Sequence, residues 1–147
     1  MPRLLLGGVK FGIAGDPTIQ ANQVAPQYGQ KVVASITLAN TGGASASFTL
    51  TGIAVQSGTR NKQGNLWADP TNTNPTVSGT LGPGQQTTVK MYSGPAAYAE
   101  DLGGVEYLDH IYTLTVNGQA TEYLVPQCVK TPHRPNVQIV GVSYSVA

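Results

Sequence analysis

Hydrophobic and polar residues alternate most regularly between residues 29 and 50, and this stretch predicts the architecture around it. Apolar side chains recur at every second position from Val32 to Leu38, with mostly small or polar residues between them. That period of two is typical of a β-strand with one buried face. The stretch 40–43 (NTGG) tolerates a positive φ, and a second alternating run follows with Phe48 and Leu50 on one face. Two such runs around a glycine-containing connector predict an antiparallel pair.

Short alternating runs separated by turns continue along the rest of the chain. They predict further strands at 18–24, 45–55, 77–81, 85–92, 106–116, 120–129 and 136–146. Asn117-Gly118 favours a tight hairpin, and an alanine-rich piece within 93–104 favours one helical turn. No amphipathic helix of useful length appears. The pattern therefore predicts an all-β protein, an antiparallel β-sandwich or small barrel.

We expect one β domain over residues 17–131, with an arm at each end, 1–16 and 132–147. The first arm begins like a signal peptide, but Gly7-Gly8 and Lys10 interrupt its apolar run, which is also too short to span a membrane. We therefore expect a chain made in the cytosol and not exported by the usual route. The second arm follows a stiff proline-rich linker at 132–135. Its strand is expected to pair with its own sheet, and the alternative is pairing with the sheet edge of a neighbouring subunit.

Residues 57–76 are predicted to form a long irregular loop that contains the single tryptophan, Trp67. Loops of this length are uncommon in compact domains and are often functional. An exposed Trp67 would be an anchor for a protein or a sugar, whereas a buried one would cover the core. The sequence leaves these two alternatives open.

The charge content limits the classes of partner. Only 10% of the residues are charged, against about 25% in an average soluble protein, which favours a surface that neighbours largely cover. The net charge of +1 and the scattered Lys and Arg residues argue against nucleic acid as a partner. Because Cys128 is the only cysteine, no disulfide can form within the chain.

Three turn motifs resemble those of a known family. They are Tyr28-Gly29-Gln30, the stretch 39–43 (ANTGG) and the stretch 81–89 (LGPGQQTTV). Together they resemble the CARDB-like branch of immunoglobulin-like β-sandwiches over roughly residues 18–129. The resemblance implies a fold and little else, because its motifs are turn chemistry. Isolated domains of this kind with arms look like phage virion accessories, such as head decoration or tail proteins, and this is an analogy of architecture.

Candidate catalytic and metal-binding residues are sparse. His110 lies on the inward face of its predicted strand, and His133 lies in the linker, so neither completes a nucleophile–base–acid set. Cys128 is interpreted as a small buried apolar residue. Oxygen ligands for calcium would have to come from Asp69, Asn72 and Asn74, or from the acidic residues Glu100, Asp101, Glu106 and Asp109, but their spacing matches no EF-hand. The acidic residues could instead meet Arg60, Lys62 or Arg134 of a neighbour. We expect no enzyme activity, no cofactor and no metal.

The function expected from these observations is that of a non-enzymatic structural protein of a phage virion. It would be a capsid decoration or tail accessory subunit that forms homo-oligomers and docks on a larger shell or tube protein, without nucleic acid or membrane as partner. The alternatives are a carbohydrate- or protein-binding module, and a cell-surface or extracellular filament subunit joined by donated strands. The predicted interface residues are Leu4, Leu5, Leu6, Val9, Phe11, Trp67, Val137, Ile139, Val142 and Tyr144.

Overall fold

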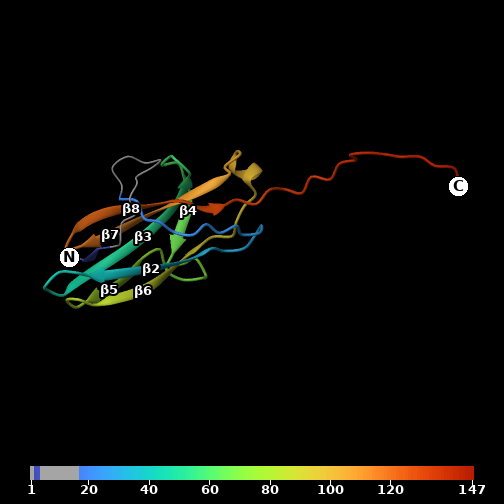
Figure 1. Cartoon of the computed structure of the whole chain (residues 1–147). Helices are drawn as coiled ribbons and strands as arrows, with labels where there is room; N and C mark the ends of the chain where they lie inside the picture. Colours follow the sequence, from blue (N-terminus) through green and yellow to red (C-terminus); the bar gives the residue numbers. More distant parts are fainter. Residues whose placement is uncertain (1, 4–16) are drawn as a thin grey trace.

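The fold is all-β, with antiparallel strands in one strongly curled sheet. A computed structural model describes residues 2–3 and 17–147 (Figure 1). The strands are β1 (Pro2–Arg3), β2 (Val33–Asn40), β3 (Ala46–Gln56), β4 (Lys62–Trp67), β5 (Val77–Leu81), β6 (Gln86–Ser93), β7 (Tyr107–Val116) and β8 (Gln119–Lys130). A short 3-10 helix, η1 (Ala99–Leu102), lies between β6 and β7. Among the described residues, no helix is long and apolar enough to cross a membrane.

The sheet has the strand order β1-β2-β6-β4-β3-β7-β8, with β5 paired to β3 beside this path. The curled sheet forms two layers, one with β1, β2 and β6 and the other with β3, β5, β7 and β8. Strand β4 joins these layers, because it pairs with β3 through Ile53–Asn65 and with β6 through Trp67–Tyr92. Residues 17–24 run parallel to β8, with isolated bridges Thr18–Leu124 and Val24–Val129. The layers are therefore hydrogen-bonded to each other along β4.

The predicted antiparallel pairing of 32–39 with 45–55 is wrong. Strand β2 pairs with β6, and β3 pairs with β4, β5 and β7. The alternation identified the buried faces correctly, since Leu38 of β2 and Leu50 of β3 both belong to the main core cluster. The two strands belong to opposite layers, and the connector at 41–45 crosses between them. Asn40 stabilises this crossing, because its side-chain amide donates to the carbonyls of Ala44 and Leu81 at 2.8 and 2.9 Å.

The predicted loop at 57–76 is also different in the structure. Its first half is a β-hairpin, because β4 pairs with the end of β3. Only residues 68–76 remain irregular, and Asp69 organises them by accepting hydrogen bonds from Thr71, Thr73 and Asn74. These bonds hold the pKa of Asp69 well below its ordinary value. Its carboxyl group is thus engaged by its own loop. No group of three or more His, Cys, Asp or Glu in the described part of the chain could hold a metal ion.

The predicted strands at 77–81, 85–92, 106–116 and 120–129 agree with the structure. The predicted strand at 18–24 forms only two isolated bridges to β8, and the one at 136–146 is not a strand. The Asn117-Gly118 turn joins β7 to β8, and both residues have a positive φ, 53° and 78°. Both central residues of a type I′ hairpin turn require this geometry. Helix η1 corresponds to the expected helical turn within 93–104. His110 and Cys128 are buried, as their positions on the inward faces predict.

Candidate functional site

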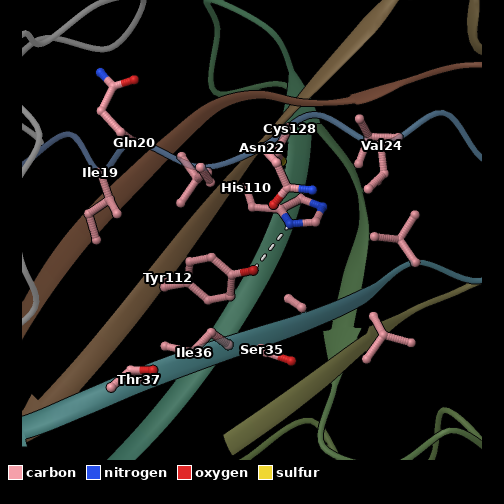
Figure 2. A pocket seen from close by; sticks show the side chains of 16 residues that line it. Ile19, Gln20, Asn22, Val24, Ser35, Ile36, Thr37, His110, Tyr112 and Cys128 are labelled. Carbon is pink, nitrogen blue, oxygen red and sulfur yellow. Dashed lines mark hydrogen bonds between the residues drawn. The ribbon is translucent and has the colours of Figure 1, made fainter. Parts of the chain in front are cut away.

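A groove of about 420 Å³ lies between the segment 19–24 and β2, where the curled sheet does not close on itself (Figure 2). Ile19 and Val24 line one side, Ala34 and Ile36 line the other, and Tyr112 of β7 lies between them. None of the described residues that line it is Asp, Glu, Lys or Arg. The groove is therefore suited to an uncharged, largely apolar ligand or segment.

The backbone of β2 directs hydrogen-bonding groups toward this groove that no described residue pairs with. Val32 accepts a hydrogen bond from the Ser93 amide at 2.9 Å, and the Asn40 amide donates to Gln85 at 2.9 Å, so these even-numbered residues bond to β6. In an antiparallel ladder, alternate residues bond to the same side. Val33, Ser35 and Thr37 consequently direct their N–H and C=O groups away from β6. No described residue pairs with these three positions on the groove side, since β1 reaches only Ala39 and Asn40.

Three titratable side chains of the described lining, His110, Tyr112 and Cys128, lie in the groove and are uncharged there. His110 and Tyr112 share a hydrogen bond of 3.2 Å between Nδ1 and Oη (Figure 2). Burial lowers the pKa of His110 to about 4, and burial raises the pKa of Cys128 to about 12. At neutral pH the imidazole is neutral and the thiol is protonated. An activated cysteine–histidine pair needs the opposite states, so the electrostatics do not favour nucleophilic catalysis by this pair.

Residues 132–147, which we call the tail, form a second candidate functional site beside the groove. They contain no strand, and the part beyond Arg134 extends away from the domain (Figure 1). The expected pairing with the chain's own sheet is wrong for the structure described here. The side chains of its apolar residues are 67% to 101% exposed: Val137, Ile139, Val140, Val142, Tyr144 and Val146.

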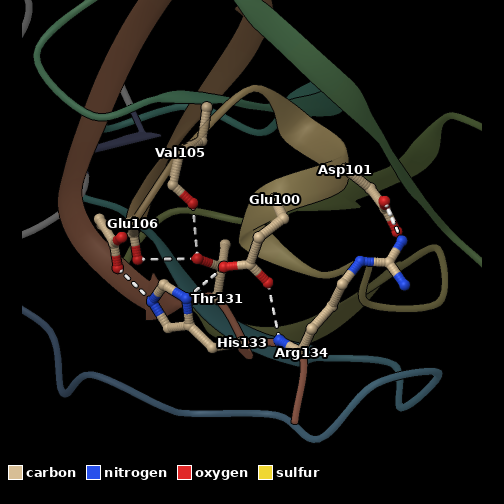
Figure 3. A network of polar contacts seen from close by, with 7 residues as sticks. All are labelled: Glu100, Asp101, Val105, Glu106, Thr131, His133 and Arg134. Carbon is tan, nitrogen blue, oxygen red and sulfur yellow. Dashed lines mark hydrogen bonds and ion pairs between the residues drawn. The ribbon is translucent and has the colours of Figure 1, made fainter. Parts of the chain in front are cut away.

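The root of the tail is fixed to the domain by a polar network (Figure 3). His133 contacts two carboxylates, Glu100 through Nδ1 at 2.5 Å and Glu106 through Nε2 at 2.6 Å. Glu100 also accepts a hydrogen bond from the Arg134 amide at 2.7 Å, and the Arg134 guanidinium binds Asp101. Three of the acidic residues that we considered as calcium ligands or contacts to a neighbour, Glu100, Asp101 and Glu106, thus bind basic residues of their own chain. The fourth, Asp109, accepts hydrogen bonds from backbone amides of its own chain.

Aromatic stacking extends this network. The Arg134 guanidinium lies 5.0 Å from the ring centre of Tyr98, and Tyr98 stacks on Tyr28 at 4.2 Å. The Thr131 hydroxyl donates to the Val105 carbonyl at 2.6 Å, and the Ala99 amide donates to the Pro132 carbonyl at 2.7 Å. The tail is therefore held in one direction through Arg134, and only the residues after it are without contacts to the domain.

We expect the fixation of the tail root to depend on pH. Hydrogen bonds to Glu106 and Glu100 raise the pKa of His133 above its ordinary 6.5, so its contribution is present below pH 6.5 and is lost as the pH rises through the raised value. Hydrogen bonds from Arg134 and His133 lower the pKa of Glu100 from 4.5, so its contribution is lost as the pH falls through the lowered value. The NMR order parameter of the Arg134 amide should be highest between these limits and should fall as the pH is raised to about 9.

His133→Ala is the control for this pH dependence. The variant should show a low Arg134 order parameter at all pH values above 6.5. An unchanged alkaline decrease in His133→Ala would contradict the assignment to His133. The other histidine does not interfere, because the pKa of His110 is near 4.

The predicted interface residues lie in three different places. Leu4, Leu5, Leu6, Val9 and Phe11 lie outside the described residues. Trp67 is half-buried in β4, paired with Tyr92 of β6, and therefore does not lie in an open loop. Val137, Ile139, Val142 and Tyr144 are all exposed on the tail.

Comparison with known proteins gives similarity of structure only. No protein-family profile matches the chain, and no curated protein matches its sequence. The PapD-like domain 7 (ASH domain) of human CEP192 is structurally similar with a TM-score of 0.44 and 10% identity, over 90% of this chain and 96% of that one. Pseudomonas fluorescens AlkC, an alkylpurine DNA glycosylase bound to abasic-site DNA, aligns with a TM-score of 0.35 and 14% identity, over 74% of this chain and 27% of that one. At these values the matches carry no argument about function.

Proposed function

We propose that this chain is a non-enzymatic structural subunit that joins copies of itself, and a larger protein lattice, through its tail. A phage virion is the proposed assembly, with the chain as a head decoration or tail accessory subunit. The single observation that carries the proposal is the exposed alternating segment of the tail. From Val140 to Val146 every second residue is apolar, with glycine or serine between them. An extended segment with this period forms a stable strand only when another sheet edge binds it and buries its apolar face.

The low charge of the chain supports the same proposal. Residues 135–147 contain no charged side chain, whereas exposed edges and tails of soluble proteins usually carry charges that prevent association. Six exposed apolar side chains on an uncharged segment form a surface that association would cover. The β domain supplies the rigid body, and the network around His133 sets the direction of the tail.

The first test is the mass of the protein in solution, measured by light scattering, for the full chain and for a chain truncated after Pro135. Truncation at this point keeps His133 and Arg134, which contact the domain, and removes only residues that do not. We expect concentration-dependent oligomers for the full chain and monomers for the truncated one. Oligomers of equal size in both would refute assembly through the tail.

A matched pair of substitutions sharpens this test. Val142→Asp places a charge on the apolar face of the tail, and Ser143→Asp places the same charge on the opposite face one residue later. Because a carboxylate is costly to bury, Val142→Asp should abolish association, whereas Ser143→Asp should leave it nearly intact. Equal loss in both variants would mean that the tail does not bind as a strand with one buried face.

The filament alternative uses the same tail, and the two assemblies differ in location. Recovery of the chain in purified virions would support the virion proposal, and recovery only from cell surfaces would favour an extracellular filament. The carbohydrate-binding alternative rests on Trp67, which lies half-buried in a paired strand, and loss of sugar binding in Trp67→Ala would support it.

A further inference from the structure

We infer that the groove beside β2 is the acceptor site for the tail of a second copy of this chain, which enters as an added strand. This inference rests on the proposed function and names the surface to which the tail binds. The groove and the tail each have backbone hydrogen-bonding groups that no described strand pairs with. Strand β2 has backbone N–H and C=O groups at Val33, Ser35 and Thr37 that no described residue pairs with, and the tail has an extended alternating segment that pairs with no described strand.

The dimensions of the two surfaces agree. The groove borders residues 32–37, the first half of β2 with the residue before it, and the alternating part of the tail extends from Val140 to Val146. At a rise of about 3.3 Å per residue, both segments span roughly 20 Å. A strand added to the edge of β2 could therefore form a ladder along the whole length of the groove.

The chemistry of the two surfaces also agrees. Ala34 and Ile36 of β2 line the groove next to Tyr112, and these residues belong to or pack against the main core cluster. An added strand would place Val140, Val142, Tyr144 and Val146 against this cluster and its glycine and serine residues toward solvent. Among the described residues, neither surface carries a charge at neutral pH, since the ionisable side chains of the described groove lining, His110, Tyr112 and Cys128, are uncharged there. Association would thus bury no unpaired charge.

The tail of one copy is directed away from its own domain. Its root is held by His133 and Arg134 against Glu100, Glu106 and Asp101, and the residues beyond run outward (Figures 1 and 3). Donor and acceptor are different surfaces of the same molecule, so the contact is head-to-tail. Such contacts close into rings or extend into filaments, depending on the rotation between neighbouring copies.

The acceptor site can be tested without self-assembly, by using a peptide. The domain truncated after Pro135 retains every described contact of the fold, and the probe is a synthetic peptide of residues 136–147. We expect NMR shift changes in the bound domain at residues 19–24, 32–37 and 125–129. A Val142→Ser peptide should bind about tenfold more weakly or worse, because it loses the burial of a valine side chain, and a Ser143→Ala peptide should bind almost normally. Shift changes confined to another surface, or no binding at millimolar peptide, would overturn the inference.

A complementation experiment with the full chain tests the same site in the assembly. Ser35→Pro removes an N–H group that points into the groove and leaves the hydrogen bonds to β6 intact, as proline requires at a sheet edge. Ser35→Ala keeps the N–H group and serves as the control. The Ser35→Pro chain should be monomeric alone but should form a one-to-one complex with the truncated chain, whose groove is intact and whose tail is absent. Ser35→Ala should assemble as the unmodified chain does.

The outcomes separate the two proposals. If Ser35→Pro chains that retain the native circular dichroism spectrum still self-assemble through their tails, the groove inference fails and the proposed function stands. If the unmodified full chain shows no tail-dependent association, the proposed function fails. The peptide experiment then decides the groove inference alone. Binding to the groove after deletion of residues 1–14, but not before, would show that the first arm of the same chain occupies this site, and this result would also overturn the inference.

Discussion

Replacing Leu50 with alanine is expected to lower the free energy of unfolding by about 3 kcal/mol. Leu50 is fully buried in β3 and belongs to the core cluster that both layers share. Removing its isobutyl group loses the transfer free energy of the side chain and leaves a cavity, because two layers joined through β4 can close around it only in part. Urea unfolding of the purified protein measures the change.

Thr49→Ala provides the matched control for this experiment. Thr49 precedes Leu50 in the same strand, and its side chain is exposed on the outer face. We expect a change within about 0.5 kcal/mol for this exposed position. Similar losses in the two variants would mean that β3 contributes through its backbone pairing and not through a core between the layers.

Replacing Asp109 with alanine is expected to cost about 3 kcal/mol for a different reason. Asp109 is fully buried, and its carboxyl group accepts two backbone hydrogen bonds, from Gly58 at 3.0 Å and from Gln127 at 2.7 Å. Gly58 lies in the turn between β3 and β4, and Gln127 lies in the bulge of β8 with a φ of 46°. Asp109 therefore joins two irregular backbone segments, and its loss would leave both amide groups without an acceptor.

Two further variants test this explanation. Asp101→Ala removes an exposed carboxyl group from η1 and should change the free energy of unfolding by less than about 0.5 kcal/mol. Asp109→Asn should lie between the two alanine variants, because its amide nitrogen can face only a donor at one of the two sites. A cost for Asp109→Ala no greater than that for Asp101→Ala would contradict the role of Asp109 as a connector.

Much of the strand content could be predicted from the sequence, because alternation is a local property. The buried faces of β2, β3 and β6 follow the period of two, and Asn117-Gly118 fixes its hairpin through local backbone preference. The partner of each strand could not be predicted in the same way. Alternation says which face of β2 is buried but not whether β3 or β6 lies beside it.

Strand β4 escaped prediction because it has almost no apolar pattern. Its residues 62–65 are polar or glycine, and only Leu66 is buried. Its conformation depends on pairing with β3 and β6, which are brought together by residues distant in the sequence. The polar composition instead indicated a loop, which placed Trp67 in the wrong environment.

In the candidate site, too, local features could be predicted from the sequence, whereas features that depend on strand pairing could not. The sequence identified the apolar tail residues and the inward position of His110, which are local features. It could not identify the groove, because an open edge exists only when the pairing of all other strands is known. The role of Asp109 was missed as well, since its partners Gly58 and Gln127 are ordinary residues that the β3–β4 turn and the β8 bulge bring to it.

The position of β4 also determines how the two layers can move relative to each other. On one side of the molecule, β4 is hydrogen-bonded to both layers. On the other side, no described backbone hydrogen bond joins residues 19–24 to β2. A rotation of one layer against the other would therefore have its axis near β4, and the width of the groove is the distance that it would change most. A strand bound in the groove would join the second side as well and turn a hinged pair of layers into a closed barrel.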